Sequence, residues 1–99
     1  MISEIAVLDV KAGEELAFET AVTRAAPLFK RARGCLALRL ECSLEVTSRY
    51  WLIVHWETVE DHVVHFRHSD DHAEWHRLVR HHLAIAPVVE HGCTVIKSF

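Results

Sequence analysis

The segment from Tyr50 to Trp56 constrains the fold of this chain more than any other. As a strand it would be apolar on both faces, with Trp51 and Ile53 on one side and Leu52 and Val54 on the other. A strand of this kind is normally covered on both faces. The helices of a small domain can cover only one face of its sheet. We therefore expect the other face to meet a second subunit.

Chain length and composition support that expectation. The chain has 99 residues, which is enough for one domain, residues 1–99, around one hydrophobic core. Apolar residues make up 51% of the chain, and a domain of this size buries only part of its surface. We predict a homodimer in which the apolar surplus lies between the subunits.

Charge and hydropathy disfavour several classes of protein. The net charge is −3 and no basic block is present, so we expect no binding to nucleic acid. The longest apolar stretches, such as residues 50–54, are far shorter than the ~20 residues needed to cross a bilayer, so we expect no membrane partner. The first residues lack a basic start followed by an apolar core, which predicts no signal peptide.

The cysteines indicate a reducing compartment. Cys35, Cys42 and Cys93 are odd in number and form no CxxC pair. This pattern favours free thiols in the cytoplasm over a disulfide framework. Cys35 and Cys42 are expected on opposite faces of one strand, as small buried hydrophobic residues.

Hydrophobic periodicity predicts the order of the elements. Pro27 should kink the first helix or begin a short second segment, and Gly34 should end it. Thr58 resembles the start of a capping box, and Ser69 is a candidate N-cap at which the second helix restarts. In chain order the pattern predicts a strand over 2–10, a helix from 14 to about 33, strands over 35–44 and 50–56, a helix over 58–68 that restarts at 69, and a strand over 88–96.

This β-α-β-β-α-β order predicts an α+β, ferredoxin-like domain with a four-stranded antiparallel sheet and helices on one face. In the second strand, Leu36, Leu38 and Leu40 are expected to share one face, and Arg39 and Glu41 the other.

Short motifs in order along almost the whole chain carry a resemblance to a known family. They are Gly13-Glu14-Glu15 with Phe18-Glu19, Gly34-Cys35-Leu36, Tyr50-Trp51-Leu52, Trp56-Glu57-Thr58, His65-Phe66-Arg67 and Pro87-Val88-Val89-Glu90-His91. Together they resemble the antibiotic biosynthesis monooxygenase family. The resemblance implies a dimeric α/β barrel in which two four-stranded sheets face each other and each subunit holds a pocket between sheet and helices. It also implies one of several activities, since members include cofactor-independent oxygenases of polycyclic phenols and haem-degrading oxygenases.

Histidines and aromatic residues are the candidate site. His65, nine residues after Trp56, is the first choice for a general base, because imidazole titrates near neutral pH. His72 and His76 are predicted as further catalytic imidazoles. Trp56, Phe66 and Trp75 are predicted to form the substrate-binding aromatic wall, although Trp56 is more typical of a packing residue.

Haem and metal are weaker alternatives. The resemblance places His76 near the iron ligand of haem-degrading members, but residues 2–10 lack the asparagine of those members and the second helix offers His65 and Phe66 in place of their tryptophan. The pairs His62/His65 and His72/His76 each share a helical face, yet no third ligand follows at fixed spacing. We therefore predict no metal site and no cofactor, with haem on His76 as the open exception.

The leading hypothesis is a cofactor-independent or reduced-flavin-supplied monooxygenase acting on a small aromatic or quinol-like molecule in an apolar pocket. The alternative is a non-catalytic dimer that binds haem or another hydrophobic ligand. A third hypothesis is a structural dimer whose nine histidines tune association with pH.

Overall fold

The computed structural model describes all residues from Met1 to Phe99. The predicted order of elements is confirmed, and with it the α+β, ferredoxin-like class. The elements are β1 (Ile2–Asp9), α1 (Glu15–Lys30), β2 (Cys35–Cys42), β3 (Arg49–Trp56), the π-helical turn η1 (Asp61–Phe66), α2 (Asp70–Val79), the short 3₁₀ turn η2 (Arg80–His82) and β4 (Val88–Gly92).

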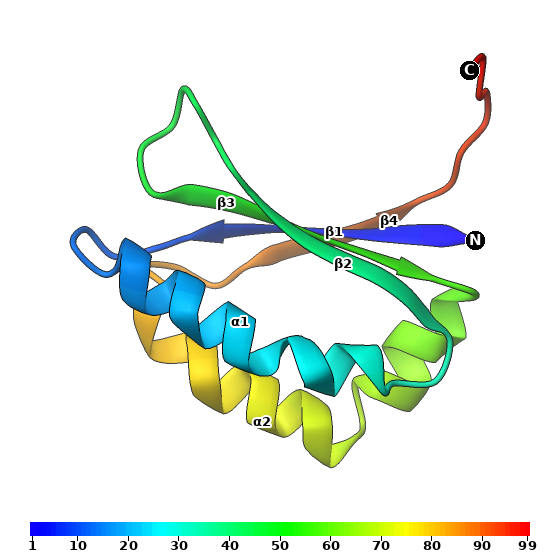
Figure 1. The fold of residues 1–99 in the computed structure, drawn as a ribbon, viewed down its shortest axis with the longest axis horizontal. Helices are drawn as coiled ribbons and strands as arrows, with labels where there is room; N and C mark the ends of the chain where they lie inside the picture. The colour runs from blue at the N-terminus through cyan, green and yellow to red at the C-terminus, as the bar shows by residue number, and fades with distance from the viewer.

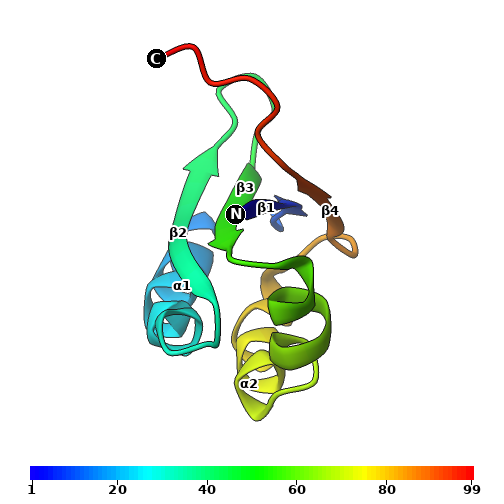
Figure 2. The same ribbon diagram turned by 90° about the vertical axis from the view of Figure 1, so that its right-hand side faces the viewer.

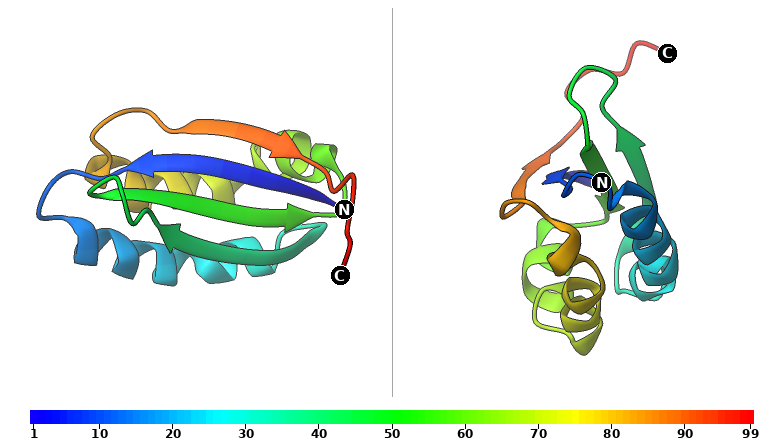
Figure 3. Two further views of the ribbon diagram at one scale, coloured as in Figure 1. Left: turned by 90° about the horizontal axis from the view of Figure 1, so that it is seen from above. Right: turned by 90° about the vertical axis from the view of Figure 1, so that its left-hand side faces the viewer.

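The four strands form one antiparallel sheet in the order β2-β3-β1-β4. Both helices lie on the same face of this sheet, and the opposite face carries no helix (Figures 1 and 2). Seen from above, the strands cross the molecule side by side with the helices behind them (Figure 3). None of the helices combines the length and hydropathy needed to cross a membrane.

The core lies between the sheet and the helices. Sixteen buried apolar residues form one cluster. Alternate positions of β3 point into it, so Leu52 and Val54 are buried while Trp51 and Ile53 remain half-buried on the bare face. One face of α1 covers the cluster at helical spacing, as the periodicity predicted.

The first helix differs in detail from the prediction. It contains no second segment at Pro27, because the helix runs unbroken to Lys30 with Pro27 in its last turn. The end of the helix falls three residues short of the predicted one. Gly34 then reverses the chain with φ +75°, and a Cβ atom at this position would run into the carboxylate of Asp61. Glycine is required there for both reasons.

A bulge in β2 removes Leu36 from the face predicted for it, whereas Leu38 and Leu40 share one face and Arg39 and Glu41 the other, as predicted. The register against β3 shifts between Cys35 and Ala37. Leu36 lies within this shift, has no partner on β3 and is 51% exposed. A β-bulge adds one residue to a strand and so reverses the facing of what precedes it.

The bulge also changes the position of the cysteines. Cys35 pairs with Trp56 and Cys42 with Tyr50, both buried on the helix side, so the two cysteines share a face. The prediction of opposite faces was wrong. All three thiols are free, but Cys42 and Cys93 are exposed and Cys35 is half-buried, so the predicted burial was wrong as well.

The last strand is shorter than predicted, ending at Gly92 and not at Ile96. From Cys93 onward the chain leaves the sheet and rises on the side opposite the helices (Figure 1). This segment forms no strand, and Val95 and Ile96 are exposed.

Candidate active site

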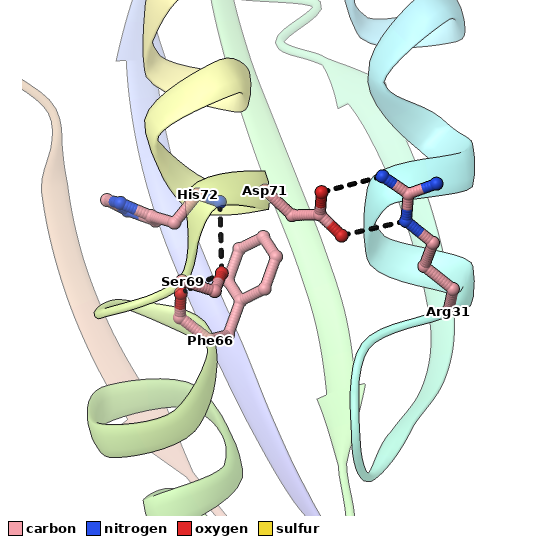
Figure 4. Close-up of polar contacts among 5 residues, drawn as sticks. All are labelled: Arg31, Phe66, Ser69, Asp71 and His72. Atoms are coloured by element: carbon pink, nitrogen blue, oxygen red, sulfur yellow. Dashed lines mark hydrogen bonds and ion pairs between the residues drawn. The ribbon is translucent and has the colours of Figure 1, made fainter.

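The break between η1 and α2 places two of the predicted site residues side by side. Ser69 caps α2: its Oγ accepts a hydrogen bond from the backbone N–H of His72 at 3.1 Å and donates to the carbonyl of Phe66 at 2.6 Å (Figure 4). This confirms the predicted N-cap. As a result the rings of Phe66 and His72 lie edge to face, with centroids 5.5 Å apart.

An ion pair holds the start of α2 against the end of α1. The guanidinium of Arg31 donates two hydrogen bonds to the carboxylate of Asp71, at 2.8 and 2.6 Å (Figure 4). The pairing holds the pKa of Asp71 below its usual range. The pair is largely exposed, so it orients the helices more than it stabilises them.

A hollow of about 170 Å³ lies between the sheet, η1 and α2. Its walls are mainly aromatic and aliphatic, and several titratable side chains open into it. The lining residues are Glu4, Ala6, Leu8, Phe29, Leu52, His62, Phe66, Arg67, His72, Trp75, His76, Pro87 and Val89.

The structure brings four of the six predicted site residues into this hollow: Phe66, His72, Trp75 and His76. Phe66 and Trp75 are buried, His72 is half-buried and His76 is exposed. The imidazoles of His72 and His76 stack with centroids 6.1 Å apart. Burial, with the nearby charge of His76, lowers the pKa of His72.

His65 and Trp56 lie elsewhere. His65 is exposed and borders a separate hollow with Arg31, Arg33 and Asp71. Trp56 has no exposed surface and packs beneath the first hollow, with its ring stacked on His62 at a centroid distance of 5.4 Å. This burial agrees with a packing role for Trp56, which is the more typical role of a tryptophan at such a position.

A chain of polar side chains, Glu4, His62 and His91, runs from the hollow, and none of these three was among the predicted site residues. The carboxylate of Glu4 accepts a hydrogen bond from Nε1 of Trp56 at 3.0 Å. Nε2 of His62 lies 3.3 Å from the same oxygen of Glu4, and Nδ1 of His62 lies 2.7 Å from Nε2 of His91. Glu4 is 5% exposed and His62 is 4% exposed.

Burial determines the charge states of Glu4 and His62. It raises the pKa of Glu4, which the hydrogen bond from Trp56 and the charge of Arg67 only partly offset. It lowers the pKa of His62 to about 4, and the charges of His91, Arg67 and His72 act in the same direction. His62 is therefore neutral at pH 7, and its 3.3 Å contact with Glu4 is not an ion pair.

The sequence contains one sign of these buried polar residues. Glu4 is the charged residue in an otherwise apolar alternation, between Ile2 and Ala6 on the face of β1 that turns inward. A carboxylate at an inward position is costly to bury unless it is hydrogen-bonded, so its presence indicates partners or a function. The identity of those partners could not be read from local spacing.

Comparison with known proteins decides the family. The model of the antibiotic biosynthesis monooxygenases matches residues 1–78, more than half of the chain. This chain belongs to the antibiotic biosynthesis monooxygenase family. The resemblance seen in its motifs is thereby confirmed.

Two relatives are similar to this chain over nearly the whole length of both proteins. The uncharacterized protein YczJ of Bacillus subtilis (strain 168) is 40% identical over 91 residues, which cover 92% of this chain and 96% of YczJ. A crystal structure from Bordetella bronchiseptica, whose protein carries the name of the same family, is 47% identical with a TM-score of 0.94. That match covers 96% of this chain and 97% of the other.

More distant members share the fold. A mutant of SnoaB, a cofactor-independent oxygenase from Streptomyces nogalater, matches with a TM-score of 0.80 and 15% identity, over 98% of this chain and 95% of SnoaB. At that identity the likeness concerns the fold alone.

The hollow does not fit haem. A cavity of about 150 Å³ holds one benzene ring, whereas haem is a macrocycle of four pyrrole rings, and the volume here is about 170 Å³. His76 lies on its wall, but the space beside it is too small for the group unless the helices separate. No cluster of three or more histidine, cysteine or acidic side chains is arranged to hold a metal ion.

Proposed function

We propose that this protein is a small-molecule monooxygenase of the antibiotic biosynthesis monooxygenase type that oxidises an aromatic phenol or quinol in the hollow between its sheet and helices. The observation that carries the proposal is the composition of that hollow. It combines aromatic walls from Phe66 and Trp75 with a buried carboxylate, Glu4, and the imidazoles of His62 and His72.

These groups suit a reaction in which the substrate itself reduces oxygen. A base removes the proton of the phenol, and the resulting phenolate transfers an electron to O₂. For a quinol, addition of one oxygen atom gives a hydroxyquinone, and the second atom leaves as water, so no external reductant is consumed. Arg67 also borders the hollow, and its positive charge favours the phenolate.

The volume of the hollow suggests the size of the substrate. About 170 Å³ corresponds to one six-membered ring with small substituents. We therefore propose single-ring phenols and quinols as substrates, in contrast to the polycyclic phenols that the family resemblance alone suggested.

Oxygen consumption with a panel of phenols and quinols of one to four rings tests this proposal. We expect turnover of single-ring quinols and a fall of about 10²-fold or more in kcat/KM when the group that takes the substrate proton is lost, which Glu4→Gln tests for the buried carboxylate. His72→Ala and His76→Ala test the two imidazoles within the hollow, and His65→Ala tests the base predicted from sequence. The exposed His68, which borders none of the hollows described here, supplies the matched control His68→Ala.

Saturable binding of these compounds without oxygen uptake would instead favour the non-catalytic ligand-binding dimer. Equal rates for the parent and for all pocket variants would contradict a reaction at this hollow.

We also propose that the protein is a homodimer joined through the bare face of the sheet. On this face Val88, Val7 and Trp51 lie in one cross-strand row, and Ile5 and Ile53 lie in the next. No helix covers them (Figures 1 and 2). An apolar patch of this extent is costly to expose, and a second copy of the sheet would bury it.

Light scattering across a concentration series tests the dimer. Ile53→Lys puts a charge in the middle of the proposed interface and is expected to raise the dissociation constant at least 100-fold, since an unpaired buried charge costs several kcal/mol. Val64→Lys makes the same kind of change at an exposed position of η1 and should leave the dimer intact. A monomeric parent at micromolar concentration would overturn the proposal.

A further inference from the structure

We propose that Glu4, His62 and His91 form a proton relay that connects the hollow with the protein surface. Glu4 exchanges the proton with the bound substrate, and the two imidazoles exchange it with solvent. The role of the relay in turnover rests on the proposed function, whereas the relay itself is a property of the folded chain.

Three elements assemble the relay. Glu4 on β1 and His91 on β4 are direct partners in the sheet, and both point to the helix side. His62 comes from η1 and lies against both of them. Trp56 holds the far end of the chain through its hydrogen bond to Glu4.

The two ends of the relay face different environments. Glu4 and His62 border the hollow, whereas His91 does not, and His91 is partly exposed. Successive polar atoms of the relay are 3.3 Å and 2.7 Å apart, which leaves no room for a water molecule between them. A proton can therefore pass between the buried carboxylate and the surface through the imidazoles alone.

The relay has two proton arrangements that differ by one proton. In the first, Nε2–H of His91 donates to Nδ1 of His62, and Nε2 of His62 carries its proton 3.3 Å from the carboxylate of Glu4. When Nδ1 of His91 takes a proton from water, its Nε2 proton passes to Nδ1 of His62, and the Nε2 proton of His62 passes to Glu4. Glu4 is then a carboxylic acid, and both imidazoles are neutral before and after the passage.

The reverse passage returns Glu4 to its ionised form and releases one proton to water. In the hollow the matching step is the transfer of a proton from the substrate hydroxyl to the carboxylate of Glu4, which yields a phenolate and a carboxylic acid. No electron is exchanged in these steps.

The charges around the relay keep it from storing a proton on His62. Arg67, at the end of η1, and His72, on α2, both act against a positive His62, and burial acts most strongly in the same direction. Arg67 partly favours the ionised form of Glu4, which burial disfavours. Cys35 on β2 is also close to Glu4, and burial raises its pKa, so it remains a neutral thiol.

Nitrogen-15 NMR of the histidine rings over pH 4.5–8 tests the relay without substrate, because the ¹⁵N shift distinguishes a protonated from an unprotonated ring nitrogen. We expect His62 and His91 to exchange tautomers together, in one step, while His62 stays neutral. In Glu4→Gln this joint step should disappear. A structural role alone would leave His62 in one tautomer at every pH, and that result, or a cationic His62 above pH 5, would overturn the relay.

Further variants guard against misfolding and non-specific effects. His91→Ala removes the partly exposed end and should fix His62 in the tautomer whose proton lies on Nε2, toward Glu4. Glu19→Gln is the matched control, because Glu19 likewise accepts a hydrogen bond from a buried aromatic residue, Tyr50, at 2.6 Å, but lies outside the relay. It should leave the joint step unchanged.

The two proposals fail in different ways. If the joint step is present and no phenol or quinol is oxidised, the relay stands and the proposed function falls. If quinols are oxidised without a joint step, the function stands and the relay falls. Where both hold, turnover should drop about 10-fold or more in His91→Ala and recover when imidazole is added to the buffer.

Discussion

Replacing Trp56 with alanine is expected to lower the free energy of unfolding by about 3–5 kcal/mol. Trp56 has no exposed surface, and its ring packs on His62 and Phe66 at centroid distances of 5.4 and 5.5 Å. Neighbouring strands and η1 surround the site, so the cavity left by the indole cannot collapse fully. The loss of the indole N–H adds to the cost, because Glu4 would be left buried with one hydrogen bond fewer.

A second variant separates packing from hydrogen bonding. Trp56→Phe keeps most of the buried ring and removes the donor to Glu4, so we expect a loss of about 1–3 kcal/mol. Urea denaturation at one fixed protein concentration measures both variants, since the stability of the proposed dimer would depend on concentration. Leu16→Ala, at a position 79% exposed, should change stability by less than about 0.5 kcal/mol. A loss below about 1 kcal/mol in Trp56→Ala would contradict this account of the core.

Acid is expected to destabilise the protein through His62 by about 3 kcal/mol between pH 6.5 and pH 4. The pKa of His62 is about 4 in the folded chain, against about 6.5 in an unfolded one. Between these values the unfolded chain binds a proton that the folded chain does not, so the free energy of unfolding falls as pH falls. The lowered pKa of His72 acts in the same direction.

Glu4 opposes this trend. Its pKa is raised in the folded chain, so the folded carboxyl takes up a proton at a higher pH than the unfolded one and stability increases with acid in that window. The net fall in the parent is therefore smaller than the contribution of His62. Denaturation at pH 7.5, 6.5, 5.5 and 4.5 should show a shallower loss in His62→Gln than in the parent. His68→Gln makes the same change on the surface, and equal slopes in the parent and His62→Gln would contradict the prediction.

Much of the fold was readable from local patterns. The hydrophobic periods of the chain predicted the order and type of the elements, because strand and helix periods are properties of the backbone. Ser69 was identified as an N-cap from its type and its place before two aspartates, since capping depends on atoms three residues apart. Gly34 was predicted to end the first helix, but the helix ends at Lys30 and Gly34 forms the turn that follows it.

The predictions that failed depended on partners far away in the chain. The bulge at Leu36 reflects the register of β2 on β3, and neither strand alone specifies it. The early end of β4 at Gly92 reflects the length over which β1 can pair with it. The cysteine faces were assigned by counting residues, and one bulged residue was enough to reverse them.

The candidate site shows the same division. Residue patterns alone specified the family, the element order, and the presence of Phe66, His72, Trp75 and His76 on the segments that border the hollow. Folding was needed to join Glu4 to His62, 58 positions later, and His62 to His91, 29 positions later. Local spacing carries the periodicity of one element, whereas the distance between side chains on three elements depends on strand register and helix placement, which form only when the whole core packs.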